Sequence, residues 1–395
     1  MSLGTKIFKI VCCVILFILF IVSIIIVVVI LKKVERNAIY RDRAENCLEI
    51  YNNYTIINQN PIPNGGQYYN EFFKENKYYG LRDFYYAASY KSYLPCGYTN
   101  DVVSYNAIKN VLLYGARVIN LDIFYEGANA FSDDAKIIVG NVIDNKLSFL
   151  EGTSDDKQYL EFMNCLELID ELGWKKTDAP LFLYLNMEFD PNTGLEYQIF
   201  SQLSTKLAKY FMENYYSFQS TNIGDIPVNK ALNKLIILTN RKPIDSSLNE
   251  ITNGIMSEDS TNIILYTFSD AEISYGGIKT KFAKKEDAIE VSMYNLVAVI
   301  KKSDINSKNK YIQKIDSTNY DASINFDLGI SMSFMNWQTY PKEYLDRFSN
   351  GGMLLKPLSL IYIPKPKPPV YERDRTYDYK NTRVTGLDGF YDFEI

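Results

Sequence analysis

The sequence predicts an α/β protein, a distorted (β/α)8 TIM barrel preceded by one N-terminal transmembrane helix. The first observation behind this prediction is an apolar run at residues 10–31, in which Ser23 is the only polar residue. The second is that short apolar runs alternate with amphipathic stretches from about residue 82 onwards. The third is composition, because 47% hydrophobic and 14% aromatic residues in a chain of 395 can fill a real core.

The apolar run, Ile10 to Leu31, is long enough to cross a lipid bilayer. At a helical rise of about 1.5 Å per residue it spans roughly the 30 Å of the hydrocarbon layer. Lys32 and Lys33 follow it directly, in place of the small residues of a signal-peptide cleavage site. We therefore expect a retained single-pass helix whose partner is the bilayer.

Basic residues are more frequent after this helix than before it, which places the large domain on the cytosolic side by the positive-inside rule. A glycosylation sequon at Asn53 would require the opposite orientation if it were used. We interpret it as a chance match.

Five parts are predicted along the chain. They are an N-terminal tail at 1–9, the transmembrane helix at 10–31, a stalk at 32–80, the barrel at 81–363 and a C-terminal arm at 364–395. The stalk is polar and interrupted by proline and glycine. The arm begins with a polyproline-like segment and continues with charged and aromatic residues. We expect the arm to dock on a protein partner or on a neighbouring copy, although a disordered tail is the alternative.

The predicted strands share a nearly continuous apolar character, which a parallel sheet covered on both faces requires. They are Phe84–Ser89, Arg117–Phe124, Lys136–Val139, Leu181–Met187, Leu235–Thr239, Asn262–Phe268, Ile330–Phe334 and Leu358–Ile363. The predicted helices are Val102–Leu113, Lys157–Leu172, Glu196–Asn214 and Ala288–Ile300. About eight strands that alternate with helices favour the barrel, with a doubly wound open sheet as the alternative on pattern alone.

Composition excludes several classes of function. The chain has no histidine, so it cannot carry out Ser-His-Asp, Cys-His or zinc-imidazole chemistry. The net charge of −5 gives no reason to expect a nucleic-acid partner. Its five cysteines are scattered without a Cys-X-X-Cys pair, which favours a reducing compartment over a disulfide framework.

Several segments, in the same order along the chain, resemble the X and Y boxes of eukaryotic phosphoinositide-specific phospholipase C. Residues 88–94 resemble the family's SSHNTYL, residues 115–122 its GCRxxELD, residues 314–320 its RxDSSNY and residues 329–339 its GxQMVALNFQT. Residues 350–357 resemble NGGxGYVLKP with two residues missing. The resemblance implies a distorted TIM barrel with its site at the C-terminal ends of the strands.

In this resemblance the two catalytic histidines of the family are replaced. The first falls on Tyr90 and the second on Asn141. The family mechanism needs one group to deprotonate an inositol hydroxyl and another to protonate the leaving oxygen. Tyrosine titrates near pH ~10 and asparagine does not titrate, so neither can do this at neutral pH. We therefore predict no catalytic residues.

The calcium ligands of the family are replaced as well. They map to Lys91, Asn120, Asp122 and Asn186, of which only Asp122 is a carboxylate. Calcium binds about six to eight oxygen ligands. A lysine ammonium has no lone pair with which to bind a metal ion. We expect no metal and no other cofactor, and we predict that Lys91 pairs with Asp122 in place of the cation. Rescue by carboxylates at positions 188 and 190 is the less favoured alternative.

Inositol-phosphate binding is left open by the sequence. The basic residues at the matching positions are Arg241 and Lys314, and these are the candidate headgroup-binding residues. Residues 316–320 and 336–338 are expected to hold the barrel loops together and not to contact a ligand.

The leading functional hypothesis is a catalytically inactive, membrane-anchored scaffold or interaction protein. The Asn-, Ile- and Tyr-rich composition suggests a large DNA virus, in which the protein would be a minor capsid or membrane-linking component of a virion with an internal membrane. The first alternative is a non-catalytic phosphoinositide receptor. The second is an active phosphodiesterase that uses groups such as Tyr90 and Glu188.

Overall fold

The computed structural model describes two parts of the chain: a helix near the N-terminus and most of the predicted barrel. The described residues are 8, 10–32, 34–35, 79–95, 103–126, 136–143, 146–147, 159–189, 196–211, 214–215, 222–243, 246–260, 263–268, 278–279, 285–301, 319–339, 341–348 and 351–362. Residues 36–78 of the predicted stalk and the arm at 364–395 lie outside them. Residues 1–361 form one compact unit and residues 362–395 a second, of which only Tyr362 is described.

The N-terminal helix runs from Ile10 to Lys32, one residue beyond the predicted span. It is apolar enough to cross a membrane by length and composition. A signal sequence near the N-terminus would have these same properties.

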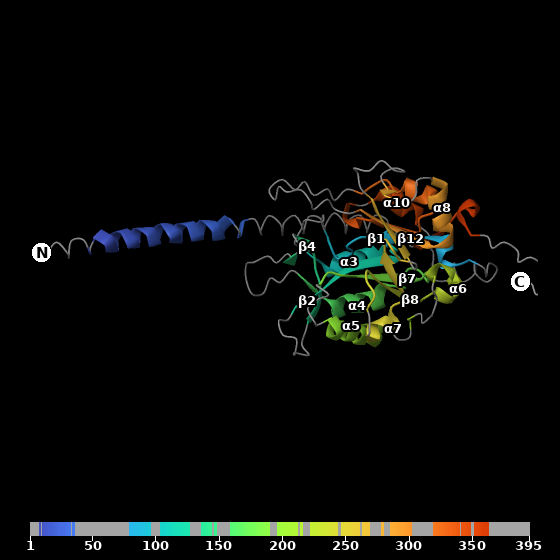
Figure 1. The fold of residues 1–395 in the computed structure, drawn as a ribbon, viewed down its shortest axis with the longest axis horizontal. Coiled ribbons are helices and arrows are strands. Elements are labelled where there is room, and N and C mark those ends of the chain that lie inside the picture. The colour runs from blue at the N-terminus through green and yellow to red at the C-terminus, as the bar shows by residue number, and fades with distance from the viewer. Residues whose placement is uncertain are drawn as a thin grey trace, which may run out of the picture. The chain divides into compact units, whose positions relative to one another are not determined.

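Eight parallel strands form a closed barrel (Figure 1). In chain order they are β1 (Phe84–Ser89), β2 (Val118–Glu126), β7 (Leu181–Met187), β8 (Leu235–Thr239), β9 (Gly254–Ser257), β10 (Ile263–Phe268), β12 (Leu296–Lys301) and β13 (Met332–Met335). Each strand pairs with the next, and β13 returns to β1 through the register Tyr86↔Met332 to Ser89↔Met335. Because the ring closes, the open doubly wound sheet is excluded.

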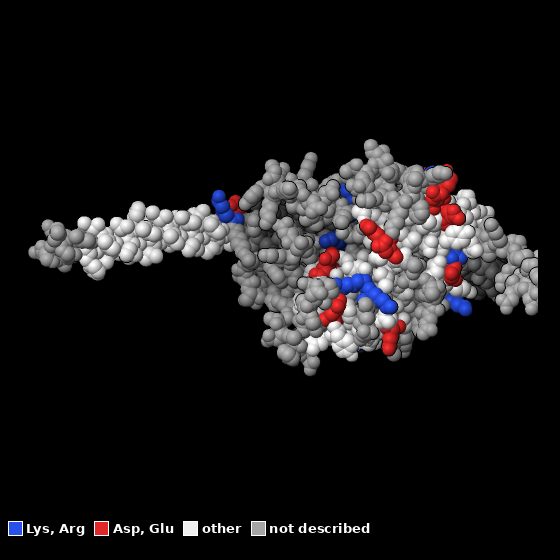
Figure 2. All heavy atoms as spheres, in the orientation of Figure 1, with Lys and Arg blue, Asp and Glu red and all other residues white. Residues whose placement is uncertain are grey.

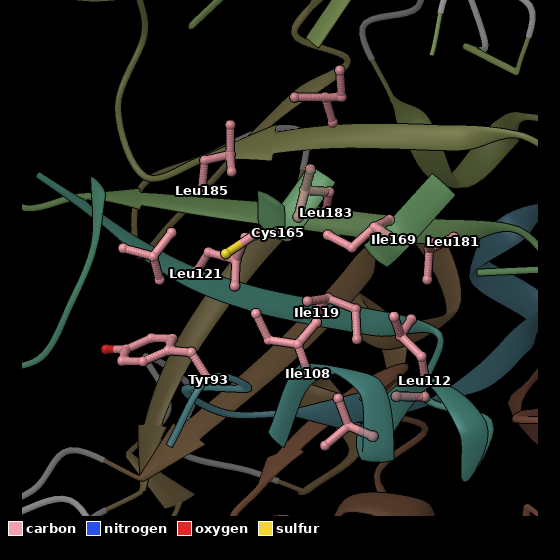
Figure 3. Packing of buried hydrophobic residues seen from close by; sticks show 14 of the residues in the cluster. Tyr93, Ile108, Leu112, Ile119, Leu121, Cys165, Ile169, Leu181, Leu183 and Leu185 are labelled. Carbon is pink, nitrogen blue, oxygen red and sulfur yellow. The ribbon is translucent and has the colours of Figure 1, made fainter. Parts of the chain in front are cut away.

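Alternation along the strands divides the buried residues into two clusters. Phe182 and Tyr184 on β7 belong to a cluster inside the barrel, while Leu181, Leu183 and Leu185 belong to a larger cluster between strands and helices. Figure 3 shows this outer layer, in which leucines and isoleucines of β2 and β7 face apolar side chains of two helices. This double burial explains the nearly continuous apolar strand sequences.

Helices cover the barrel between most consecutive strands. They are α3 (Tyr105–Leu113), α4 (Phe162–Leu172), α5 (Glu196–Phe211), α6 (Val228–Ala231), α7 (Ser247–Ile251), α8 (Lys285–Tyr294), α9 (Ser323–Asp327) and α10 (Lys342–Arg347). Ser104 begins α3 by accepting a hydrogen bond from the backbone N–H of Asn106, as an N-cap does. Only residues 258–262 join β9 to β10, too few for a covering helix, so the helical ring is uneven there.

Short strands and turns extend the barrel. β3 (Lys136–Val139) is antiparallel to β2, β6 (Leu160–Glu161) to β3 and β11 (Ile278–Lys279) to β10, while β4 (Val142–Ile143) and β5 (Lys146–Leu147) form a separate pair. The 3-10 turns are η1 (Leu81–Asp83), η3 (Ile223–Asp225), η4 (Trp337–Thr339) and η5 (Leu358–Leu360).

A last strand, β14 (Met353–Leu355), pairs with β1 at the N-terminal end of the barrel, on the edge of β1 that β2 uses further along. It is antiparallel to β1 at Phe84–Tyr86, whereas β2 pairs with β1 only at Ala88 and Ser89. The approach is close at Gly352, where an added Cβ would collide with the carbonyl oxygen of Gly115. β14 therefore fills the part of the barrel wall that β1 and β2 leave open.

Several predicted elements are wrong or misplaced. Leu358–Ile363 was predicted as a strand, but 358–360 form the turn η5. The predicted helix Ala288–Ile300 contains the end of α8 and most of β12. The apolar run at 296–300 is compatible with a buried helix or a buried strand, and in the structure it is a strand. Lys136–Val139 is a strand but lies outside the parallel ring. The strands β9, β12 and β14 were not predicted.

Charged residues on the face seen in Figure 2 are mixed in sign among the described residues. This surface gives no sign of a large field of one charge.

Candidate functional site

The candidate site lies at the C-terminal ends of β1, β2 and β7. On β2, Ile119 and Leu121 belong to the outer cluster, so the alternating residues Asn120 and Asp122 face the barrel interior. Asn186 is aligned with Asp122 in the β2–β7 register. The end of β1 is followed at once by Tyr90 and Lys91. The four predicted metal-ligand positions are thus brought to one end of the barrel.

The ammonium of Lys91 lies at the centre of this group. Its Nζ is 3.1 Å from Oδ2 of Asp122, so the predicted ion pair is present. The same Nζ donates a hydrogen bond of 2.7 Å to Oδ1 of Asn141, and it lies 5.9 Å from the centroid of the Tyr90 ring. Lys91 therefore contacts both residues that stand at the histidine positions of the resemblance.

Both carboxylate oxygens of Asp122 accept hydrogen bonds from protein groups. The Tyr93 hydroxyl donates to Oδ2 over 2.8 Å, and Nδ2 of Asn186 donates to Oδ1 over 3.0 Å. Nδ2 of Asn186 also donates to Oε1 of Glu188 over 2.6 Å. With Lys91, three protein donors occupy the acceptor positions that a metal ion would need.

The backbone at Lys91 is left-handed, with φ 43°. Such a conformation costs a lysine about 1–2 kcal/mol, and asparagine adopts it more readily. It is held by the Lys91 N–H, which donates to Oδ1 of Asn120 over 2.9 Å, and by the carbonyl of Lys91, which accepts from Nε2 of Gln338 over 3.4 Å. These contacts direct the side chain toward β2 and β3.

The ion pair is buried. Lys91 is 9% exposed, Asp122 and Asn141 2% each, and Asn120 1%. A buried ion pair is stable only when further hydrogen bonds satisfy both partners, and here Tyr93, Asn141 and Asn186 provide them. The group is a closed polar cluster within the fold.

Burial and neighbouring carboxylates raise the pKa values of three groups in the cluster. Burial, with the charges of Asp122 and Glu188, raises the pKa of the Tyr90 hydroxyl far above its usual value. Burial and then Asp122 raise the pKa of Tyr93 in the same way. The pKa of the Glu188 carboxyl is also raised, first by burial and then by Asp122.

The residues present do not fit a calcium ion. Asp122 is already bonded to three donors, and Lys91 places an ammonium where an oxygen ligand would be needed. Within the part of the chain that the structure describes, no group of three or more His, Cys, Asp or Glu residues could hold a metal. Of the two rescue carboxylates considered, Glu188 is bonded to Asn186 and Asp190 lies outside the described residues.

The candidate headgroup residue Arg241 is engaged with the protein. Its Nη2 donates to the carbonyl oxygen of Phe189 over 3.0 Å and lies 3.6 Å from Oε1 of Glu196. Its guanidinium also stacks on the Phe189 ring at 4.4 Å. The second candidate, Lys314, lies outside the described residues, as do Asp316 and Ser317.

The residues predicted to support the loops do so where they are described. Asn319 and Asn336 are joined by two hydrogen bonds of 2.8 and 2.6 Å through side chain and backbone. Nε1 of Trp337 donates to the carbonyl oxygen of Ala88 over 2.9 Å. These contacts tie the ends of β13 and β1 together.

Two side-chain contacts were missed from the sequence. Tyr93 bonds Asp122, and the signal was its place two residues after Lys91 in a segment already singled out. Tyr344 of α10 inserts its hydroxyl between β1 and β13, where it accepts from the Ala88 N–H and donates to the Ser333 carbonyl, both over 2.9 Å. No local sequence pattern marks this second contact.

Comparison with known proteins identifies the barrel by its shape. No family model and no curated protein matches the sequence. Among solved structures, the chain is similar to PLC21 of L. pealei and to PLC21 of S. officinalis, each with a TM-score of 0.53, 16% identity, and coverage of 72% of this chain and 38% of that one. A Ca²⁺-dependent phosphatidylinositol-specific phospholipase C from Streptomyces antibioticus is also found, with a TM-score of 0.42, 11% identity, and coverage of 70% of this chain and 99% of that one. The barrel is phospholipase C-like.

This likeness is one of fold. The chain matches only 38% of the length of the two PLC21 proteins, so the remainder of those proteins has no counterpart in the match. What the phospholipase C-like barrel does in this chain has to be argued from its own residues.

Proposed function

We propose that this phospholipase C-like barrel is catalytically inactive and serves as a membrane-anchored scaffold or interaction module. The observation that carries the proposal is the position of Lys91, whose ammonium lies 3.1 Å from Asp122 and 2.7 Å from Asn141. It joins the one carboxylate left at the metal positions to the asparagine at the second histidine position. A buried, internally neutralised cluster favours a role in holding the fold together.

The chemistry available at these positions supports the same proposal. A phosphodiesterase of this kind needs a base, an acid and a cation that stabilises the developing charge on phosphorus-bound oxygens. Tyr90 carries a hydroxyl whose pKa is raised, and the Asn141 amide does not titrate. The Lys91 charge is directed at Asp122.

The decisive experiment measures hydrolysis of phosphatidylinositol vesicles by the purified chain, with and without calcium. We expect no release of inositol phosphate in either condition. Release that is lost in Tyr90→Phe, but kept in the matched surface variant Tyr197→Phe, would overturn the proposal and favour an enzyme with unconventional acid-base groups.

A second experiment tests whether Lys91 stands in for a cation. The triple variant Lys91→Asn, Asn120→Glu, Asn186→Glu restores the oxygen ligands that the resemblance implies. We expect calcium to raise the melting temperature of this variant and to leave that of the unaltered chain unchanged. Equal calcium effects on both proteins would contradict the assignment.

The receptor alternative is less well supported, because the Arg241 guanidinium is already bonded to Glu196 and Phe189. We expect the chain to bind phosphoinositide vesicles no more tightly than phosphatidylserine vesicles of equal charge. A preference that disappears in Arg241→Gln or in Lys314→Gln would favour the receptor.

Anchoring through residues 10–31, with the barrel on the cytosolic side, is part of the proposal. Its support is the apolar helix Ile10–Lys32 and the basic residues that follow it. We expect the intact chain to stay in membranes that are washed at alkaline pH. If cells instead release a chain that has lost its N-terminal helix, the helix is a cleaved signal sequence. Protease protection of the barrel outside the cytosol would reverse the orientation.

A role as a minor capsid or membrane-linking protein of a virion with an internal membrane follows from the composition and the anchor. Its partners would be proteins contacted through the arm at 364–395. This role of the arm can be tested by crosslinking the full chain, and a chain that lacks the arm, to neighbouring proteins and comparing the products. Identical crosslinked products from both would contradict a role for the arm.

A further inference from the structure

A second buried lysine lies far from the candidate site, at the opposite end of the barrel. Lys356 follows β14 directly and is 2% exposed. Its backbone N–H donates to the carbonyl oxygen of Asp83 over 2.9 Å, which continues the attachment of β14 to the start of β1. Lys356 thus lies where β14 fills the gap between β1 and β2.

The ammonium of Lys356 is poorly compensated. Within the described residues, Nζ donates one hydrogen bond, to the carbonyl oxygen of Ser292 on α8 over 3.2 Å. The Tyr85 ring of β1 lies 5.7 Å from Nζ. The charged neighbours are Asp83 and Arg82, both in η1 and opposite in sign. A buried ammonium with one carbonyl acceptor is costly, and the neutral amine is favoured.

We infer that Lys356 is a proton-controlled latch for β14: the neutral amine lets the strand stay seated in the barrel wall, and protonation favours its release. The reason is geometric. Lys356 follows β14 with no intervening residue, so a movement that takes Nζ from the Ser292 carbonyl into water would carry β14 with it. The proton is taken from water, no covalent bond changes, and the latch is reversible.

The direction of the effect follows from the equilibrium of the lysine. Burial, together with Arg82 and against the attraction of Asp83, lowers the pKa of Lys356 to about 7 in the seated strand. In an open strand it returns to about 10.4, the ordinary value of an exposed lysine. Between these two values the seated form is neutral and the open form is charged, so each unit of falling pH favours opening by about tenfold. Below about pH 7 both forms are charged and the effect ends.

The test is amide hydrogen exchange of the peptide covering residues 351–357, followed by mass spectrometry of the full chain between pH 7 and 9. Intrinsic amide exchange accelerates by about tenfold per pH unit, and the observed rate follows it when local opening is rapid and reversible. Because opening falls by the same factor, we expect the exchange rate of β14 to be nearly independent of pH. In Lys356→Met, which cannot be protonated, the rate is expected to rise by about tenfold per unit.

Lys175→Met, at an exposed lysine just after the end of α4, is the matched control and should keep the flat profile of the unaltered chain. A rate that rises equally in the unaltered chain and in Lys356→Met would overturn the latch. Should Lys356→Met fail to fold, the Cε resonance of Lys356 can be followed by NMR in the unaltered chain. Titration of every lysine Cε resonance above pH 9 would overturn the proposal as well.

Discussion

The two ends of the barrel each bury a lysine, and they treat it in opposite ways. At the C-terminal end, Lys91 lies 3.1 Å from a carboxylate that itself accepts two further hydrogen bonds. At the N-terminal end, Lys356 donates to one backbone carbonyl, and burial lowers its pKa to about 7. The comparison teaches that burial alone does not decide whether a lysine stabilises a fold. The two ends differ in the partner of the ammonium, which is a carboxylate for Lys91 and a backbone carbonyl for Lys356.

The largest loss of stability is expected when the ion pair between Lys91 and Asp122 is removed. Lys91→Met leaves the Asp122 carboxylate buried without its cation, which should lower the free energy of unfolding by about 3–5 kcal/mol. The measurement is chemical denaturation at pH 7. In a background that already carries Asp122→Asn, the same change should cost much less, because no carboxylate is left to compensate. Equal costs in both backgrounds would show that the ion pair does not couple the two residues.

At the N-terminal end of the barrel, we expect an added side-chain atom at Gly352 to lower the stability of the fold. Gly352 has a φ of 78°, and a Cβ there would meet the Gly115 carbonyl and lie 2.9 Å from Cγ of Arg117. Gly352→Ala is expected to destabilise the fold by about 2–4 kcal/mol through strain and displaced backbone. Gly329→Ala is the control, since it shares a positive φ of 72° but has no contact closer than 3.4 Å. A similar melting temperature for both variants would contradict a close crossing at β14.

The buried Lys356 predicts that the stability of the fold depends on pH. Because the folded pKa of Lys356 lies below its unfolded value, the folded state binds fewer protons, and stability rises with pH from about 7 to about 10.4. The slope should reach about 1.4 kcal/mol per pH unit. The contribution is measured as the difference between the unaltered chain and Lys356→Met across this range. A difference that is constant with pH would contradict it.

The smallest effect is expected at the seam between β1 and β13. Tyr344→Phe removes the hydroxyl that links the Ala88 N–H to the Ser333 carbonyl and should cost about 1–2 kcal/mol. Tyr210→Phe on α5 serves as a control for loss of a hydroxyl outside this seam. A melting temperature unchanged by Tyr344→Phe would show that the two strands pair directly in its absence.

The sequence predicted the elements whose pattern is local. β1, β7 and β8 were predicted with the residue bounds that the structure has, because each is a continuous apolar run of strand length. β12 was taken for the end of a helix, since apolar residues in both structures look alike when both faces are buried. β14 could not be predicted at all: three residues become a strand only because β1 and β2 leave space for them.

The same distinction holds for the candidate site. The approach of Lys91 to Asp122 was predicted, because the resemblance placed both at neighbouring strand ends. The bond from Lys91 to Asn141 and the role of Tyr93 depend on side-chain directions that spacing does not define. The burial of Lys356 gave no sequence signal, because it results from α8, η1 and β14 packing together.

The left-handed backbone of Lys91 has a consequence for how this chain can change. The position would accept asparagine with less strain, so a single substitution toward a calcium ligand is favourable for the backbone. That same step would leave Asp122 buried without a cation until further carboxylates arrive and bind a metal. Lys91→Asn alone is therefore expected to destabilise the fold, whereas the same change together with Asn120→Glu and Asn186→Glu would let a metal ion take the place of the ammonium. The strain of the backbone and the charge of the buried carboxylate thus favour different residues at position 91.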